Sequence, residues 1–303
     1  MVNDQCEMKP WISAFRLRTL PLSLSCIGMA AFLAAAAGKF DGLLFTLCCL
    51  TTVFLQILSN LANDYGDSIN GADHAGRKGP QRAVQSGVIT SSQMRNAVVL
   101  FSVLCLLSGI GLLLIAFGFD WNALFFFLVL GLLCIAAAIA YTVGRKPYGY
   151  AGLGDLSVLV FFGLVGVMGS LYLFTRRVDY IDVLPALSCG FFSIAVLNVN
   201  NIRDIDSDRQ AGKFSIPVRI GRDKALAYHW FLLTAGTVSA IVYSLVRYES
   251  PWQFMFIPVV ALFVRNGIAV STLPSDKLDP WLKQMALSTL LFVVTFGIGL
   301  LLS

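Results

Sequence analysis

Long apolar segments dominate the chain, and short polar stretches separate them. Nine segments reach the roughly 20 residues that a helix needs to cross a bilayer, and they are predicted near 20–38, 42–60, 96–117, 122–142, 153–175, 180–200, 224–246, 252–272 and 285–302. Pro10 to Arg18 precedes them and is predicted to form a short helix at the membrane surface, anchored by Trp11 and Phe15. The pattern predicts an all-α polytopic membrane protein.

The composition supports this prediction. Hydrophobic residues make up 57% of the chain and charged residues 13%, and the mean hydropathy is +0.77. A soluble domain typically carries about 25% charged residues. No polar stretch is much longer than residues 61–95, so we expect a single transmembrane domain over 1–303. Its expected parts are an N-terminal interfacial segment at 1–19 and cytoplasmic loops at 61–95 and 201–223.

The distribution of basic residues predicts the orientation of the spans. Most of the 22 Lys and Arg residues fall in alternate loops on one side, and the other side receives Lys39, Arg176, Arg177 and Arg247. Because basic loops stay in the cytoplasm, the N-terminus is predicted inside and the C-terminus outside. The net charge of +5 follows from this topology and does not indicate nucleic-acid binding. Arg265 lies within a predicted span, where it could line a cavity or extend toward the interface.

A first polar cluster lies where the second span meets a basic loop. Asn60, Asn63, Asp64 and Asp67 fall within about a 100° arc of one helix face, and Asp73 follows a turn and can fold back toward them. Carboxylates are costly near hydrocarbon, so their presence suggests a function. Oxygen ligands without histidine suit Mg²⁺, which usually shares its coordination between one or two carboxylates and substrate phosphates. The cluster is therefore a predicted Mg²⁺ site.

A second cluster ends the sixth span. Asn200, Asp204 and Asp208 are spaced i, i+4, i+8 and are predicted to share one helix face. Neighbouring carboxylates repel one another unless a cation lies between them, so a second Mg²⁺ ion is expected. Asn60 and Asn200 are separated by the same interval as Asp64 and Asp204, which suggests two related four-helix halves and a ninth helix. Two such sites across one cavity would hold a single diphosphate.

Basic residues that follow the clusters are candidates for neutralising the diphosphate. After the first cluster come Arg77, Lys78 and Arg82, and Lys213 follows the second. Arg145 and Lys146 follow the fourth span.

Three runs of sequence resemble one known family. Residues 60–73 (NLANDYGDSINGAD), 141–163 (YTVGRKPYGYAGLGDLSVLVFFG) and 198–213 (NVNNIRDIDSDRQAGK) resemble the UbiA superfamily of intramembrane aromatic prenyltransferases. Residues 16–23 (RLRTLPLS) and 147–150 add to the similarity, which spans nearly the whole chain. It is strongest with the branch that prenylates 1,4-dihydroxy-2-naphthoate in menaquinone synthesis.

The resemblance implies nine transmembrane helices around a central cavity that opens to the cytoplasm and laterally to the bilayer. It also implies Mg²⁺ and diphosphate ligands at Asn60, Asp64 and Asp67, with Asp73 as a trailing acid, and at Asn200, Asp204 and Asp208. The chain departs from the family pattern in two places. Gly71 stands where the family has its third acid, and Asn200 stands where many relatives have Asp, so ligation by Asp73 and Asn200 stays open.

The reaction implied is transfer of a polyprenyl group from polyprenyl diphosphate to 1,4-dihydroxy-2-naphthoate, with loss of CO₂ and diphosphate. Asp64, Asp67, Asp204 and Asp208 would be catalytic through the metal ions, and Arg77, Lys78, Arg82 and Lys213 would bind diphosphate. Candidates for the aromatic acceptor are Arg145, Lys146, Asn63 and Tyr141. Tyr65 is the candidate for stabilising the allylic cation, with Tyr141 as a second. The long prenyl tail would stay among membrane lipids of the bacterial inner membrane.

Three other interpretations remain open at this stage. One is a non-catalytic lipid-binding protein, for which intact carboxylates on both helices would be unnecessary. A relative in the same family could use another aromatic acceptor, such as 4-hydroxybenzoate or homogentisate. A secondary transporter also uses intramembrane carboxylates, but its sites lie near the bilayer midplane on broken helices, whereas these acids lie at cytoplasmic span ends. The sequence leaves prenyl chain length and oligomeric state open.

Overall fold

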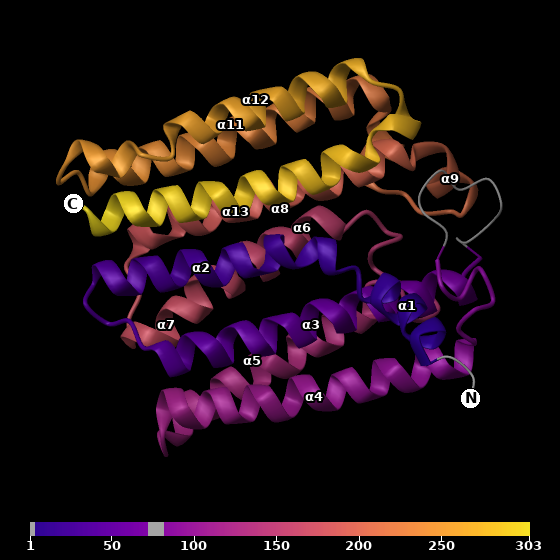
Figure 1. The fold of residues 1–303 in the computed structure, drawn as a ribbon, viewed down its shortest axis with the longest axis horizontal. Coiled ribbons are helices and arrows are strands. Elements are labelled where there is room, and N and C mark those ends of the chain that lie inside the picture. Colours follow the sequence, from indigo (N-terminus) through magenta and orange to yellow (C-terminus); the bar gives the residue numbers. More distant parts are fainter. Residues whose placement is uncertain (1–3, 72–81) are drawn as a thin grey trace.

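The computed structural model describes residues 4–71 and 82–303, with side chains from Lys9 onward, and these residues form helices without strands. Nine helical stretches within those residues are long and apolar enough to cross a membrane. They lie side by side in one bundle (Figure 1). The predicted all-α fold class is confirmed.

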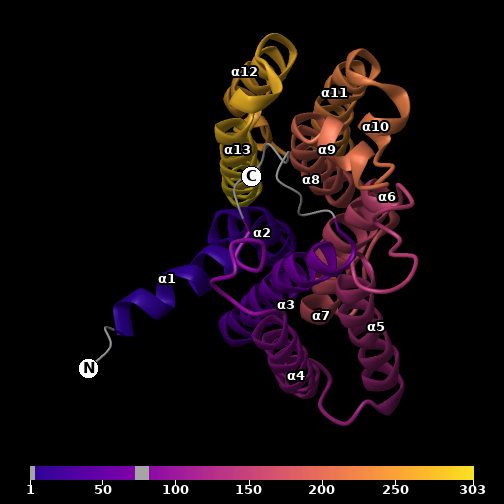
Figure 2. The same ribbon diagram turned by 90° about the vertical axis from the view of Figure 1, so that its right-hand side faces the viewer.

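The first half of the bundle begins with α1 (Asp4–Phe15), which projects away from the other helices (Figure 2). The elements that follow are the short η1 (Leu17–Thr19), α2 (Leu20–Ala36), α3 (Gly42–Ile69), α4 (Ser91–Phe117), α5 (Trp121–Ala140), α6 (Gly154–Val158), η2 (Leu159–Gly169) and α7 (Ser170–Thr175). The last three form one continuous span, Gly154–Thr175.

The second half contains η3 (Tyr180–Asp182), α8 (Val183–Arg203), α9 (Ile205–Gln210), α10 (Ile216–Ile220), α11 (Arg222–Val246), η4 (Pro251–Phe254), α12 (Ile257–Thr272), η5 (Ser275–Lys277) and α13 (Asp279–Leu301). The N- and C-terminal ends of the chain lie at opposite ends of the bundle, and α9 lies at the end that carries the N-terminus (Figure 1).

The element η2 is wound as a π-helix, and small residues bring it close to its neighbours. A Cβ on Gly163 would lie 2.9 Å from the carbonyl oxygen of Ala186, and one on Gly166 would lie 3.1 Å from Cβ of Cys26. These approaches bring η2 against α8 and α2. π-Helical turns are rare and occur often at functional sites, and this one forms part of the cavity wall described below.

Buried aromatic residues hold the second half of the bundle together. The ring of Phe192 on α8 stacks on Phe263 of α12 at 4.1 Å and meets Phe292 of α13 edge-on at 5.0 Å. Gly236 on α11 faces the same Phe192 ring, and a Cβ there would lie 2.6 Å from it. One ring thus packs α8, α11, α12 and α13 together.

The structure revises two predicted boundaries near the polar clusters. The predicted second span ends at residue 60, but α3 continues to Ile69 because Leu58, Leu61 and Ala62 keep one face buried. Residues 61–69 therefore belong to a helix and not to a loop. The expected surface helix ends at Phe15, before Arg18, and Trp11 and Phe15 pack against the cluster around Leu58 and Leu61.

Candidate active site

The first acidic cluster lies on a buried face of α3. Asn60, Asp64 and Asp67 are 4%, 2% and 3% exposed. Buried carboxylates must be compensated by cations or hydrogen bonds, and three separate segments of the chain supply these partners. They are the connector between α1 and α2, the residues just before α4, and the loop between α5 and α6.

The connector between α1 and α2 binds the deeper part of this face. Asn60 Nδ2 donates to the carbonyl oxygen of Phe15 at 2.9 Å and to Thr19 Oγ1 at 3.2 Å. Arg16 lies between Phe15 and Thr19 in the sequence, and its guanidinium forms an ion pair with Asp64. Arg16 has φ 48° and ψ 53°, a left-handed conformation that is uncommon for a residue with a side chain. The contacts of Asn60 and Asp64 hold that conformation in place.

Arg82 compensates the next turn of the face. Its guanidinium pairs with Asp67 and lies 3.7 Å from Asp64 Oδ1, and it donates to the carbonyl oxygen of Asn63 at 3.4 Å. The Arg82 side chain is 10% exposed. The structure therefore brings this predicted diphosphate-binding residue into the cluster.

The loop between α5 and α6 closes the same face. Tyr150 donates to Asp67 Oδ1 at 2.6 Å, and Thr142 Oγ1 donates to Asn63 Oδ1 at 3.2 Å. The loop can approach because α3 has Gly66 at the contact, where a Cβ would lie 2.5 Å from the carbonyl carbon and oxygen of Thr142. A glycine inside a helix costs about 1 kcal/mol relative to alanine, so this one serves the close approach.

The second cluster has a different geometry from the predicted continuous helix. The helix α8 ends at Arg203, Asp204 has φ −100° and ψ 11°, and α9 begins at Ile205. Asn200, Asp204 and Asp208 therefore lie on two helices that meet at Asp204 and not on one straight helix, although the N–H groups of Asp204 and Asp208 still donate to the carbonyl oxygens of Asn200 and Asp204, at 3.1 and 2.8 Å. At this break the side chain of Arg203 turns back onto its neighbour and donates to both carboxylate oxygens of Asp204, at 2.9 and 2.7 Å.

A turn after α9 returns Lys213 to Asp208. Gly212 has φ +71°, and Lys213 Nζ lies 3.4 Å from both carboxylate oxygens of Asp208. Burial raises the pKa of Asp208 above its usual range, Lys213 opposes that shift, and the nearby carboxylates Asp204 and Asp67 add to it. Asp67 and Asp208 therefore lie within electrostatic range of each other, so the two clusters converge. Negatively charged side chains held close together favour the binding of a cation between them.

Tyr150 connects the two clusters through both its side chain and its backbone. Its hydroxyl bonds to Asp67 of the first cluster, and its carbonyl oxygen accepts from the N–H of Phe214 at 2.9 Å, one residue beyond Lys213. Arg219 secures the same junction by donating to the carbonyl oxygens of Ala151 and Phe214, at 2.8 and 2.9 Å.

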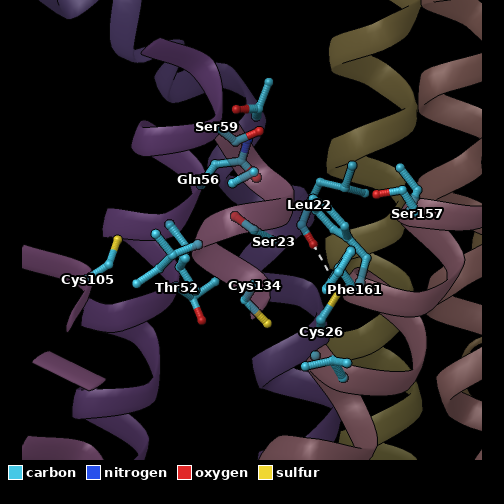
Figure 3. Close-up of a pocket in the computed structure, with 18 of the residues that line it drawn as sticks. Leu22, Ser23, Cys26, Thr52, Gln56, Ser59, Cys105, Cys134, Ser157 and Phe161 are labelled. Carbon is cyan, nitrogen blue, oxygen red and sulfur yellow. Dashed lines mark hydrogen bonds between the residues drawn. The ribbon is translucent and has the colours of Figure 1, made fainter. Parts of the chain in front are cut away.

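A cavity of about 460 Å³ begins at this site and continues into the bundle. Its polar end is lined by Arg16, Arg18, Asn60, Asn63, Asp67, Arg82, Asn200, Lys213 and Lys283. Figure 3 follows the wall from Ser59 and Gln56 past Ser23 to Thr52, Cys134 and Cys26. The far part is apolar and includes Leu112, Leu113, Phe127, Val165 and Leu173. The shape fits a molecule with an anionic head and a long hydrocarbon tail.

Aromatic side chains line the wall between these two parts. Tyr141 and Tyr148 meet edge-on, with ring centroids 5.3 Å apart, and Phe161 and Phe162 lie on the same cavity. Burial raises the pKa of Tyr141, and the neighbouring Asp155 adds to this, so its phenol stays neutral. A neutral aromatic face can stabilise a nearby cation.

Asp64, Asp204 and Asp208 are buried and are not among the residues that line this cavity, although their neighbours Asn60, Asp67 and Asn200 are. Arg145 and Lys146 are exposed and are not among its lining residues, because the loop turns them outward before Tyr150 returns. Tyr65 packs instead with the hydrophobic cluster of Trp11 and Phe15, since one residue along a helix is a rotation of about 100° from Asp64. Its predicted position at the cavity is wrong.

Arg265 is also absent from the cavity lining. It is exposed on α12, with its guanidinium 5.6 Å from the ring centroid of Trp281. Three further predicted residues, Asp73, Arg77 and Lys78, lie outside the described residues.

Three residues that contact the predicted ligands were not predicted as site residues. Arg16, Tyr150 and Arg203 each contact a buried carboxylate of the two clusters. Arg16 and Tyr150 lie within the RLRTLPLS and Pro-Tyr-Gly-Tyr runs, so the signal was present. The positions of Arg16 and Tyr150 in the sequence, far from the acids, gave no indication of a contact.

The carboxylate oxygens of the two clusters are the kind of donor that Mg²⁺ prefers. The oxygens of Asp64, Asp67, Asp204 and Asp208 are hard ligands, and Oδ2 of Asp208 is buried without a hydrogen bond. Within residues 4–71 and 82–303, no three His, Cys, Asp or Glu side chains gather as a complete metal cage. Mg²⁺ usually takes part of its coordination from substrate phosphates and water.

These features define a polytopic membrane protein with an acidic, arginine-rich site at the mouth of an apolar cavity. The chain belongs to the UbiA prenyltransferase family, whose family model matches residues 23–290.

The chain is also similar to curated proteins over nearly its full length. It is 43% identical to a 1,4-dihydroxy-2-naphthoate octaprenyltransferase of Haemophilus influenzae, over 100% of this chain and 98% of that protein. It is 42% identical to the protein of the same name from Escherichia coli, over 97% and 95% of the two chains.

Solved structures share the fold. A UbiA homologue from Aeropyrum pernix superimposes with a TM-score of 0.68 at 18% identity, over 95% of this chain and 98% of that one. A homologue from Archaeoglobus fulgidus, solved bound to DMAPP and Mg²⁺, gives a TM-score of 0.64 at 17% identity, over 94% and 98%. At these identities the likeness concerns the fold alone.

Proposed function

We propose that this enzyme transfers a polyprenyl group from polyprenyl diphosphate to 1,4-dihydroxy-2-naphthoate, with Mg²⁺ as the cofactor and demethylmenaquinol, CO₂ and diphosphate as products. The observation that carries the proposal is the convergence of two acidic clusters, through Tyr150, at the mouth of one cavity with an apolar far end. The names and lengths of the H. influenzae and E. coli relatives support the naphthoate acceptor.

The residues of the two clusters would hold the donor head. Asp64, Asp67, Asp204 and Asp208, with Asn60 and Asn200, supply oxygens for Mg²⁺, and Arg16, Arg82 and Lys213 supply positive charge to the diphosphate oxygens. Bound Mg²⁺ would stabilise the charge that develops on the diphosphate as the allylic C–O bond breaks. In the free protein Asp64, Asp67 and Asp208 pair with Arg16, Arg82 and Lys213. When the substrate binds, the carboxylates and the cations would share their charges with Mg²⁺ and the diphosphate.

The cavity wall would then protect the allylic cation until the ring attacks. Tyr141 and Tyr148 present neutral aromatic faces, and the apolar part of the cavity excludes water. A C–C bond forms between the prenyl carbon and the electron-rich ring, and loss of the ring carboxylate as CO₂ restores aromaticity.

The acceptor carboxylate needs a cation other than the exposed Arg145 and Lys146. Lys283 on α13 lines the same cavity and forms no ion pair with the carboxylates that the structure describes. We therefore propose Lys283 as the group that holds the naphthoate carboxylate before the reaction.

The expected location is the bacterial inner membrane, with the N-terminus and the site on the cytoplasmic side and the C-terminus outside. The basic loops support this orientation, and the acidic clusters lie at the end of the bundle that carries the N-terminus (Figure 1).

The test is a reconstitution of the reaction. Purified protein in detergent is incubated with octaprenyl diphosphate, 1,4-dihydroxy-2-naphthoate and Mg²⁺, and diphosphate, CO₂ and prenylated naphthoquinol are measured. We expect all three products in equal amounts and none with EDTA. A parallel incubation with 4-hydroxybenzoate tests the alternative acceptor, and preferential prenylation of that compound would contradict the naphthoate assignment.

A further inference from the structure

Arg203 contacts two of the predicted metal ligands, Asn200 on α8 and Asp204 directly after that helix. Its Nε and one terminal nitrogen donate to the two oxygens of Asp204 at 2.9 and 2.7 Å, and that terminal nitrogen also donates to Asn200 Oδ1 at 2.7 Å. The Arg203 side chain is 2% exposed. Since the guanidinium is a rigid planar fork, these bonds fix the rotation of the Asp204 carboxylate.

A second carboxylate holds Arg203 from the opposite side. The remaining terminal nitrogen of Arg203 donates to Asp279 Oδ1 at 2.6 Å, at the first residue of α13. Asp279 Oδ2 in turn accepts from Arg18, in the connector before α2, at 2.9 Å. Charges of alternating sign therefore run from Asp204 through Arg203 and Asp279 to Arg18, and join three elements that are distant in sequence.

The burial of this chain has an electrostatic consequence. A buried arginine is tolerated only when its charge is compensated, and here two carboxylates share that charge. Without Asp279, Asp204 would be the one carboxylate bonded to Arg203, with Asp208 acting only electrostatically, and the positive charge of Arg203 would oppose a divalent cation at Asp204 more strongly. With Asp279, Asp204 stays oriented and keeps more of its negative charge available.

We propose that Arg203 and Asp279 are positioning residues that orient the Asp204 carboxylate for the Mg²⁺–diphosphate complex. The inference rests on the proposed function, because it concerns the same site. Groups that hydrogen-bond to metal ligands typically change metal affinity or activity by 10- to 100-fold when they are mutated. Neither residue needs to touch substrate for this effect.

The test measures binding and not turnover. A prenyl diphosphate analogue with a bridging sulfur in place of the scissile oxygen, geranyl thiolodiphosphate, is titrated into the purified protein by calorimetry at several Mg²⁺ concentrations. We expect Asp279→Asn and Arg203→Lys each to raise the Mg²⁺ concentration for half-maximal binding by about 10-fold or more. Asp279→Glu retains the charge and should restore most of the affinity.

Arg222→Lys is the matched control. Arg222 lies on the same end of the bundle and bonds to the carbonyl oxygen of Leu273 at 2.7 Å and to Ser275 Oγ at 2.8 Å, both in the segment that leads to Asp279. Both of these partners are uncharged, so its replacement should leave the Mg²⁺ dependence unchanged even where it lowers the thermal unfolding midpoint.

The outcomes distinguish the positioning role of Arg203 and Asp279 from the proposed function of the site. An unchanged Mg²⁺ dependence in folded Asp279→Asn protein would overturn the positioning role, as would an equal shift in Arg222→Lys. If Arg203→Lys does not fold, Asp279→Asn decides, since that side chain is 34% exposed. Absence of Mg²⁺-dependent binding in the unmodified protein would instead contradict the proposed function itself.

Discussion

The hydroxyl of Tyr150 donates a hydrogen bond of 2.6 Å to Asp67 Oδ1. Asp67 lies on α3 and Tyr150 lies in the loop between α5 and α6, and the carbonyl oxygen of the same tyrosine accepts from the N–H of Phe214, in the segment after the second acidic cluster. One residue thereby sets the distance between the two clusters. A hydrogen bond to a charged group contributes about 1.5–3 kcal/mol, so its removal has a measurable consequence.

Tyr150→Phe removes this hydroxyl and leaves the backbone junction in place. We expect kcat/KM for polyprenyl diphosphate to fall by roughly 10- to 100-fold, which corresponds to that energy. Steady-state kinetics with varied donor check the prediction, and Tyr180→Phe, at an exposed tyrosine distant from the cavity lining, serves as the control. A Tyr150→Phe enzyme with unchanged kcat/KM would show that the hydroxyl does not orient Asp67.

Asp64→Asn and Asp204→Asn test the acidic clusters and carry a cost in stability. Both carboxylates are buried against arginines, and removal of one partner of a buried ion pair costs about 3–5 kcal/mol. We expect turnover to fall at least 100-fold and the thermal unfolding midpoint to fall as well. Asp276→Asn, at an exposed position, should change neither. Near-normal turnover in both variants would contradict the metal assignment.

Gly66→Ala tests the approach of the α5–α6 loop to α3. The added Cβ would lie 2.5 Å from the Thr142 backbone, and overpacking of this kind costs about 1–3 kcal/mol. We expect a lower unfolding midpoint and weaker donor binding, because the loop that carries Tyr150 must move. Gly111→Ala, with open space around its Cβ, should be neutral. If Gly66→Ala behaved like Gly111→Ala, the loop would not depend on this contact.

Gly131→Leu tests which part of the cavity holds the prenyl tail. Gly131 on α5 lines the cavity and has open space at its Cβ position, so a larger side chain there would occupy volume that the tail needs. We expect KM to rise for octaprenyl diphosphate and to stay nearly unchanged for geranyl diphosphate. The same substitution at Gly111, which does not line the cavity, should affect neither donor. Equal effects on both donors would place the tail elsewhere.

Lys283→Met tests the proposed partner of the acceptor carboxylate. Methionine keeps a similar length without the charge, so we expect KM for 1,4-dihydroxy-2-naphthoate to rise about 10-fold while KM for the donor changes little; one charge-assisted hydrogen bond accounts for an effect of this size. Lys277→Met is a control on the same end of the bundle and outside the cavity lining. A selective rise in the donor KM would reassign Lys283 to the diphosphate.

Much of the fold could be predicted because hydrophobic segments of membrane length are a local property of the sequence. The nine predicted spans correspond to the nine found among the described residues. The first acidic face was also predictable, since Asn60, Asp64 and Asp67 follow the helical period along α3. The same periodic reasoning did not indicate the break at Asp204, where α8 ends and the side chain of Arg203 bonds to the Asp204 carboxylate.

The sequence by itself determined how many helices cross the membrane and which ends of them carry the acids. Only the tertiary structure decided which groups meet those acids: Arg16 and Arg82 at the first cluster, Arg203 and Lys213 at the second, and the neutral hydroxyl of Tyr150 at Asp67. The physical reason is that a membrane span depends on the free energy of transferring side chains that are neighbours in the sequence from water into lipid. Ion pairs instead depend on where distant segments come together, and a sequence with many basic loops offers many equivalent choices.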